Sequence, residues 1–179
     1  RGVDLVTQIL SFTPGVEGKT AVIQVRDVIA EIQRIVRHTF PKNIETIFNY
    51  ADSLSTIEAD STQIHQVLMN LCANAEHAMR GSGGLLDLRL DLVMGEPDGI
   101  GTHPDPQGGA YVRLTVRDTG SGMTSEVAQR IFDPFFTTKM TNEGTGLGLS
   151  ITKGILDEHK AHIRYCLKGP NTCFEVKFE

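Results

Sequence analysis

Apolar residues recur at helical spacing in several stretches of the chain. Six apolar side chains share one face over residues 25–39 and seven share one face over residues 60–80, which predicts two amphipathic helices. Asp60 and Gln63 form a plausible capping box at the start of the second helix. Weaker helical patterns predict shorter helices at three further places: 3–12, 124–131 and 147–159.

Strict alternation of apolar and polar positions predicts the strands. It is clearest over residues 110–118, and further strands are predicted at 44–50, 85–94, 163–167 and 174–178. Residues 95–109 are rich in Gly, Pro and Asp and predict an exposed hairpin loop, whereas residues 133–146 have little apolar periodicity and predict a mobile loop. Helices and strands alternate without a regular βαβ repeat. The sequence therefore predicts an α+β fold, with a mixed, mostly antiparallel sheet and helices on one face.

Composition restricts the functional classes. A chain of 179 residues, 40% apolar and 22% charged, has a globular composition and the length of one ordinary domain with a short appendage. The net charge of −5 lacks the basic excess typical of nucleic-acid-binding domains, and no apolar run is long enough to span a bilayer. We therefore expect no nucleic-acid partner and no membrane contact. The three cysteines, Cys72, Cys166 and Cys173, lack metal-site spacing and favour a reduced intracellular setting.

A polar flank lies beside the apolar stripe of the helix at 60–80 and contains Gln66, Asn70, Asn74 and His77. Asn70 and Asn74 are one turn apart, so their amides are neighbours. Asparagine is a poor helix former, and at the edge of a core it needs a partner. An amide oxygen at this place can complete the coordination shell of Mg²⁺. The alternative is that both amides bond to neighbouring loops.

Asp118 continues the inward-facing register of the strand at 110–118, and a glycine-containing turn follows it. A carboxylate at the end of a buried face needs a hydrogen-bond donor. The exocyclic amine of a purine would serve, because the glycines let the backbone approach the ring. The alternative is an Asx turn that ends the strand.

Two further segments, 131–139 and 144–150, are candidate parts of a phosphate site. The first carries three phenylalanines that can anchor a flexible segment, and Lys139, which can reach a phosphate. The second has alternating glycines that run into a helix, a pattern that exposes N–H groups to a polyphosphate. Its spacing fits neither the dinucleotide fingerprint nor the P-loop. The alternatives are core aromatic residues with a solvated lysine, and a flexible start of a helix.

Together, in this order and spacing, the four segments resemble the N, G1, F and G2 boxes of the catalytic ATP-binding domain of sensor histidine kinases, in the GHKL (HATPase_c) superfamily. The resemblance is carried by Asn70…Asn74-Ala75, Asp118-Thr119-Gly120-Ser121-Gly122-Met123, Phe132-Asp133-Pro134-Phe135-Phe136-Thr137-Thr138-Lys139 and Gly144-Thr145-Gly146-Leu147-Gly148-Leu149. It implies a two-layer α/β sandwich of the Bergerat type, with ATP bound under a lid at about 133–146.

The resemblance also implies the cofactors, ATP and Mg²⁺, and the role of each residue. Asn74 would ligate Mg²⁺, Asn70 would support the phosphates, and Asp118 would accept a hydrogen bond from the adenine amine. Asn70, Asn74 and Lys139 would take part in transfer of the γ-phosphoryl group to a histidine. The remaining ATP contacts would come from His77, Gly120, Gly122, Met123, Phe132, Phe136, Thr137, Thr138, Gly144, Thr145, Gly146, Leu147, Gly148 and Leu149.

The domain organisation follows from the same resemblance. Residues 1–18 would be the end of the dimerisation and phosphoacceptor helix with a linker, and residues 19–179 the catalytic domain. The expected partners are the upstream dimerisation and phosphoacceptor domain and the receiver domain of a response regulator, and the whole protein would be a homodimer. This catalytic part would be cytoplasmic, and its parent protein cytoplasmic or on the cytoplasmic face of the inner membrane. No histidine of this chain lies in a suitable amphipathic helix beside an acid, so the phosphoacceptor segment is not among these residues.

Two alternatives compete with the kinase interpretation. Other GHKL ATPases, such as chaperone, mismatch-repair and gyrase types, hydrolyse ATP with a glutamate one turn before the metal asparagine. Asn70 occupies that place here and cannot take a proton from water, which favours a kinase. The other alternative is a nucleotide-sensing or degenerate kinase module, against which the intact boxes argue. Two positions depart from the family pattern: His77, where many relatives carry Lys or Asp, and Lys160-Ala161, where Gly-Gly is common.

Overall fold

The computed structural model describes residues 20–50, 56–94, 110–139, 144–166 and 171–178. Its helices are α2 (Val25–Thr39), α3 (Ser61–Met79), α4 (Ser125–Ala128) and α5 (Gly148–Glu158). Its strands are β1 (Ala21–Gln24), β2 (Ile44–Tyr50), β3 (Thr56–Ala59), β4 (Gly84–Met94), β5 (Ala110–Asp118), β6 (His162–Tyr165) and β7 (Thr172–Phe178). No helix in these ranges is long and apolar enough to cross a membrane.

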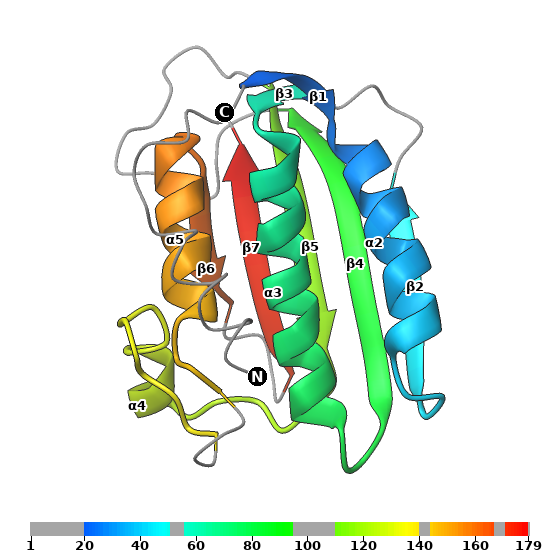
Figure 1. Ribbon diagram of the computed structural model, residues 1–179, viewed down its shortest axis with the longest axis vertical. Helices are drawn as coiled ribbons and strands as arrows, with labels where there is room; N and C mark the ends of the chain where they lie inside the picture. Colours follow the sequence, from blue (N-terminus) through cyan, green and yellow to red (C-terminus); the bar gives the residue numbers. More distant parts are fainter. Residues whose placement is uncertain (1–19, 51–55, 95–109, 140–143, 167–170, 179) are drawn as a thin grey trace.

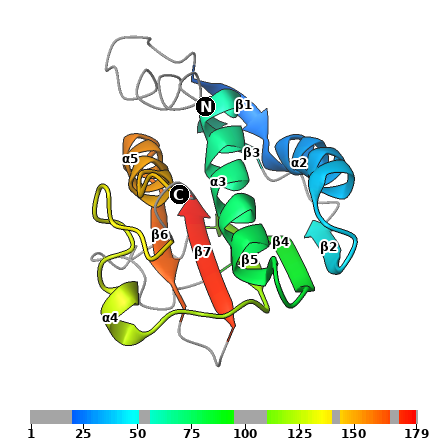
Figure 2. The ribbon, with the colours of Figure 1, turned by 60° about the horizontal axis from the view of Figure 1, so that its bottom comes forward.

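Five strands form one mixed sheet in the order β2-β4-β5-β7-β6. The β2–β4 pair is parallel and the other three pairs are antiparallel. The helices α2, α3 and α5 lie side by side on one face of this sheet, with α3 in the middle (Figure 1). The turned view shows the helices as one layer and the sheet as the other, with α4 at the lower edge (Figure 2). The predicted two-layer α+β architecture is confirmed.

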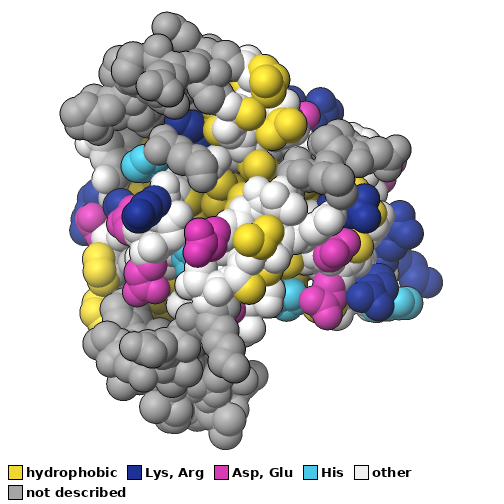
Figure 3. Space-filling model, turned by 90° about the horizontal axis from the view of Figure 1, so that it is seen from above, with side chains coloured by type: hydrophobic (Ala, Val, Ile, Leu, Met, Phe, Trp, Pro, Cys, Tyr) yellow, Lys and Arg dark blue, Asp and Glu magenta, His cyan; other side chains and the backbone are white. Residues whose placement is uncertain are grey.

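The apolar stripes of the helices meet the inward face of the sheet in one core. Fully buried side chains come from both layers: Ile29, Ile32, Ile64, Leu68, Leu71, Leu86, Leu88, Leu90, Leu114 and Leu156. The seven-residue stripe predicted for α3 is buried except at Ala78, which is half-buried and contacts the turn after β5. Figure 3 views the molecule from the end that carries β1 and β3, where apolar side chains lie beside charged ones, and Val22 is 74% exposed.

Most predicted elements are confirmed within one or two residues, and three expectations need comment. The strands β1 and β3, each four residues long, were not predicted. They pair with each other, outside the main sheet. The predicted helix at 3–12, the domain boundary at residue 18 and the hairpin loop at 95–109 lie outside the described residues. The described parts of 133–146 contain neither helix nor strand, as predicted.

The capping box predicted at the start of α3 is only half formed. The Asp60 carboxylate accepts hydrogen bonds from the N–H groups of Thr62 and Gln63, at 2.8 and 3.4 Å. The Asp60 N–H, however, donates to His159 Nε2 at 3.0 Å, and Gln63 Nε2 donates to Glu158. The end of α5 thus replaces the reciprocal bond, because it packs against the start of α3.

The other face of the sheet carries paired charges. Arg89 pairs with Asp87 within β4, Arg113 of β5 pairs with Asp91 of β4, and Arg164 of β6 pairs with Glu175 of β7. Alternation along each strand separates this charged face from the apolar core face.

Candidate functional site

The polar flank of α3 is the surface on which the glycine-bearing segments meet. Asn70 Nδ2 donates to the Gly148 carbonyl at 3.1 Å and to Thr152 Oγ1 at 3.3 Å. Thr152 is fully buried one turn into α5. Asn70 therefore joins the middle of α3 to the first turn of α5, and its amide hydrogens are used for structure.

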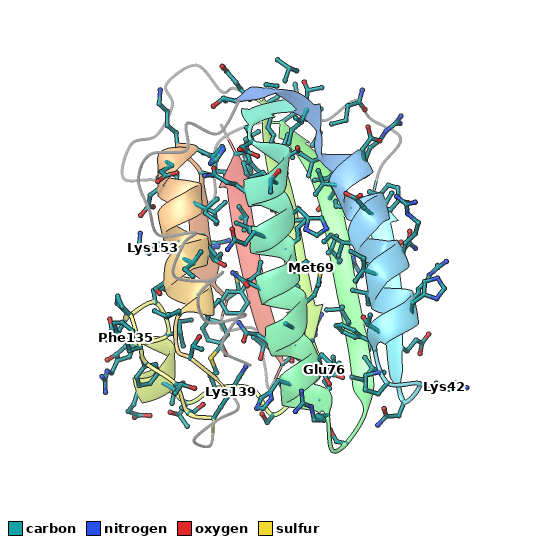
Figure 4. All side chains as sticks on the ribbon, viewed as in Figure 1. Lys42, Met69, Glu76, Phe135, Lys139 and Lys153 are labelled. Carbon is teal, nitrogen blue, oxygen red and sulfur yellow. The ribbon has the colours of Figure 1, made fainter. Side chains whose placement is uncertain are left out.

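One turn further along α3, Asn74 faces the F-box segment. The ammonium group of Lys139 donates to Asn74 Oδ1 at 3.0 Å, and Lys139 lies between the α4 region and α3 (Figure 4). The Lys139 N–H donates to Thr137 Oγ1 at 3.1 Å, which turns the chain locally. Asn74, the expected Mg²⁺ ligand, and Lys139, the lysine expected to reach a phosphate, are thus in direct contact, and the amide oxygen of Asn74 accepts from a cationic group.

Asp118 ends β5 with its side chain only 4% exposed. The Gly120 N–H donates to Asp118 Oδ1 at 2.9 Å, and the Thr172 hydroxyl also donates to this carboxylate. Burial dominates these bonds and raises the pKa of Asp118 from 3.8 to about 6. The Asx-type bond to Gly120 and the buried carboxylate therefore occur together, rather than as alternatives.

The turn after Asp118 packs against the last turn of α3. The Ser121 N–H donates to the Ala78 carbonyl at 3.3 Å. A Cβ on Gly120 would lie 2.6 Å from the Ala78 Cβ and 2.8 Å from its carbonyl oxygen, so no larger residue fits. Gly122 has φ +67°, a left-handed conformation that glycine adopts without strain, and Met123 packs half-buried against the core.

The phenylalanines of the F box separate into two anchors and one exposed ring. Phe132 is half-buried and meets Phe174 of β7 edge-on, with 6.5 Å between ring centroids. Phe136 is half-buried under the guanidinium of Arg130, 4.5 Å from its centroid. Phe135 is 75% exposed, has φ +65° and points away from the fold (Figure 4). The expectation that all three anchor the segment is wrong for Phe135.

The two ends of the predicted lid meet at Phe135 and Gly146. Gly146 has φ +69°, and a Cβ there would lie 2.4 Å from the Phe135 carbonyl carbon. A Cβ on Gly144 would lie 2.8 Å from Lys139 Cδ. Gly148 is different, since its Cβ would be 3.8 Å from the nearest atom, on Asn70. Gly146 thus permits close packing against backbone, Gly144 leaves room for the Lys139 side chain, and Gly148 begins a helix.

The remaining predicted site residues lie near these contacts. The Leu147 N–H donates to Thr145 Oγ1 at 3.4 Å, and Leu147 is buried in the core. His77 is half-buried in the last turn of α3, Leu149 is half-buried, and Thr138 is exposed. The structure gathers all four boxes around α3, while the contact of each residue with a nucleotide stays a prediction.

Sequence reasoning missed Thr152 and Thr172. Thr172 lies directly opposite Asp118 in the β5–β7 register, and Thr152 lies one turn after Gly148. A helical wheel that begins at Gly148 would have placed Thr152 beside Gly148 on the same face of α5. Thr172 could be found only by aligning two strands that are distant in the sequence.

Comparison with known proteins agrees with this geometry. The family described as histidine kinase-, DNA gyrase B-, and HSP90-like ATPase matches residues 59–179. Sensor kinase CckA of Brucella abortus is 34% identical over 178 residues, which cover 98% of this chain and 19% of that protein. The first three curated relatives have only 19%, 30% and 38% of their length spanned by this chain.

Two solved structures are informative. The nucleotide-free catalytic domain of histidine kinase ThkA superposes with a TM-score of 0.71 at 30% identity, covering 89% of this chain and 95% of that one. Histidine kinase ThkA in complex with response regulator protein TrrA gives a TM-score of 0.73 at 27% identity, covering 99% of this chain and 47% of that one.

Proposed function

Since this chain belongs to the histidine kinase-, DNA gyrase B- and HSP90-like ATPase family, we propose that it is the catalytic ATP-binding domain of a sensor histidine kinase. It binds ATP with Mg²⁺ and supplies the γ-phosphoryl group to a histidine of a dimerisation domain. A receiver domain of a response regulator then takes the group. The ThkA structure with TrrA supports the last step, because it joins a related kinase to a response regulator.

The observation that carries this proposal is the meeting of three segments on one flank of α3. Asn70 bonds to the start of α5, Asn74 to Lys139, and Ala78 to the turn after Asp118. These positions are spaced one turn apart, about 6 Å per step along the helix axis. The turn after the buried carboxylate lies at one end of this flank, Lys139 lies one turn along it, and the start of α5 lies two turns along it. This order suits a ligand with a purine at one end and phosphates at the other.

The residues present suit Mg²⁺ at Asn74. Its amide oxygen holds the Lys139 ammonium at 3.0 Å, so it is already oriented towards a cation. Mg²⁺ prefers oxygen ligands and keeps waters and substrate phosphates in its shell, so one protein oxygen is enough. When bound, Mg²⁺ would neutralise charge on the phosphates. Mg²⁺ would replace the Lys139 ammonium at this oxygen, and Lys139 would then supply a second positive charge from the F-box segment.

The amide at Asn70 favours transfer of the phosphoryl group over hydrolysis of ATP. Hydrolysis needs a base that takes a proton from water, and an amide such as that of Asn70 cannot do so at neutral pH. Asn70 instead donates to Gly148 and Thr152, and holds the start of α5. The competing function is that of a hydrolysing ATPase. It would require a base from outside this flank.

Calorimetry with purified protein tests the adenine end. Asp118→Asn should weaken ATP binding more than GTP binding, because the substitution removes the charge that accepts the adenine amine. Asp87→Asn is the matched control, since Asp87 is also buried (8% exposed) but lies on the opposite face of the sheet. Equal losses in both variants, or unchanged ATP affinity in Asp118→Asn, would rule out Asp118 as the adenine acceptor.

The phosphate end is tested with and without Mg²⁺. Asn74→Ala should remove most of the Mg²⁺-dependent gain in ATP affinity and leave Mg²⁺-free binding nearly unchanged. Asn49→Ala, at an exposed position of β2, is the control and should keep the full gain. If Asn74→Ala keeps the Mg²⁺ dependence, the metal is held elsewhere.

Labelling with γ-phosphate tests the reaction. Proximity of the acceptor nitrogen supplies much of the rate. The 179 residues alone should therefore bind ATP without labelling themselves. Addition of the upstream helical hairpin of the whole protein should produce a label on a histidine of that hairpin, labile in acid and stable in base. Strong self-labelling of the chain alone, or rapid ATP hydrolysis, would contradict the proposal.

A further inference from the structure

The charged face of the sheet, opposite the helices, carries two thiols and a carboxylate close together. Cys166 directly follows β6 and lies opposite Cys173 of β7, and the Cys166 N–H donates to the Cys173 carbonyl at 2.8 Å. Glu175 lies two residues further along β7, on the same face. The two sulfur atoms and a carboxylate oxygen lie within 4.8 Å of one another, and all three side chains are buried.

We propose that Cys166, Cys173 and Glu175 bind a thiophilic divalent cation of the Zn²⁺ class. Tetrahedral coordination with Zn–S near 2.3 Å and Zn–O near 2.1 Å places ligand atoms about 3.5–3.8 Å apart. The observed limit of 4.8 Å requires each pair of ligand atoms to approach by at most about 1.3 Å, which small side-chain rotations can supply. These three residues leave a fourth coordination position for water.

The cluster of Cys166, Cys173 and Glu175, together with Arg164, would carry no net charge when a divalent cation is bound. Arg164 Nε donates to Glu175 Oε2 at 2.9 Å, so the charge of this carboxylate is already offset. Binding then replaces two S–H bonds by two sulfur–metal bonds and releases two protons to solvent. The two thiolates formed neutralise the dication, and no oxidant or reductant is needed. A buried site that ends neutral avoids the large desolvation cost of an isolated charge.

Metal binding at these thiols competes with protons, because the thiolate is the form that binds the metal. The affinity should therefore rise with pH by up to about 100-fold per pH unit while two protons are released.

The cluster and the candidate ATP site lie on opposite faces of the sheet, and neighbouring residues of β7 contribute to both. Thr172, next to Cys173, donates to Asp118, and Phe174 contacts Phe132 of the F box. Tyr165, next to Cys166, meets Phe174 with 5.8 Å between ring centroids. A metal that draws Cys166 and Cys173 together therefore fixes the strand ends that line both sites. A change in ATP affinity on metal binding is the expected consequence, and this expectation rests on the proposed function.

Cobalt titration of the reduced, chelator-treated chain tests the proposal without any nucleotide. Co²⁺ should bind at one equivalent with a thiolate-to-metal charge-transfer band, and Zn²⁺ should displace it. Cys166→Ser and Cys173→Ser should each abolish the band and weaken Zn²⁺ binding by at least about tenfold, and Glu175→Gln should weaken it with the band retained. Cys72→Ala is the matched control, because Cys72 is a buried cysteine of α3 and is not part of the cluster. Circular dichroism of each variant verifies folding.

Two outcomes would overturn the metal assignment. One is that Co²⁺ produces no charge-transfer band, or a band that survives in both Cys166→Ser and Cys173→Ser. The other is that air oxidation joins Cys166 to Cys173 in a disulfide while the reduced chain binds neither metal, which would make the pair a redox element. Because the titration contains no ATP, neither outcome bears on the kinase proposal.

Discussion

The buried carboxylate of Asp118 should make the free domain less stable as the pH rises. Its pKa is raised from 3.8 to about 6 by burial, so the folded state holds the proton more tightly than the unfolded state does. The cost of ionisation is therefore absent below about pH 4, grows between pH 4 and pH 6, and is complete above pH 6. About two pH units at about 1.4 kcal/mol each give about 3 kcal/mol.

Asp118→Asn isolates this cost. The Asn side chain keeps an oxygen for the Gly120 N–H but cannot ionise. Its new amide hydrogens add a penalty of about 1–3 kcal/mol if they find no acceptor, but that penalty does not change with pH. The free-energy difference between the variant and the parent should therefore rise by about 3 kcal/mol in favour of the variant from pH 4 to pH 8, whatever its starting value.

Urea unfolding followed by circular dichroism, repeated across this pH range without nucleotide, measures the difference directly. Asp87→Asn should show no such gain, because the carboxylate it removes is paired with Arg89. A difference for Asp118→Asn that stays constant within about 0.5 kcal/mol over the range would refute the reasoning, since a raised pKa cannot leave stability independent of pH.

Three further predictions concern the segments that meet on α3. Gly146→Ala should lower stability by at least about 2 kcal/mol, because it combines a left-handed φ with a clash against the backbone of Phe135, whereas Gly148→Ala should stay within about 1 kcal/mol in the same thermal unfolding measurement. Amides in 133–139 should exchange faster without nucleotide than with an ATP analogue and Mg²⁺, and equal protection in both states would exclude a ligand-gated lid. Asn70→Ala should cost about 1–3 kcal/mol of stability through two lost bonds to α5, and a loss below about 0.5 kcal/mol would show that those bonds do not hold the helix.

The elements that the sequence predicted well are those in which the pattern of buried and exposed positions recurs several times along the chain. The helix α2 and the strand β5 each repeat their pattern several times, so their bounds are confirmed to the residue. The strands β1 and β3 have only four residues each, so such a pattern can recur at most twice in them. They exist because Ala21 pairs with Ala59 and Gln24 with Thr56, which is a contact between distant segments that no local pattern records.

The same limit applies to the candidate site. Position on a helical wheel was enough to place Asn70 and Asn74 on one flank of α3. Their partners, Gly148 and Lys139, depend on how the segment between β5 and α5 folds back. Cysteine spacing could not reveal the contact between Cys166 and Cys173, because the strand register brings these two residues opposite each other.

The cost carried by Asp118 also explains why an aspartate, and not an asparagine, suits this position in the proposed function. A carboxylate can only accept a hydrogen bond, so it pairs with the amine at position 6 of adenine and faces the oxygen of guanine without a donor. An asparagine could turn its amide to satisfy either base. The protein thus holds a charge that costs about 3 kcal/mol in the empty site. A donor from adenine recovers part of that cost and guanine recovers none, so discrimination between the purines arises from the same burial that destabilises the empty domain.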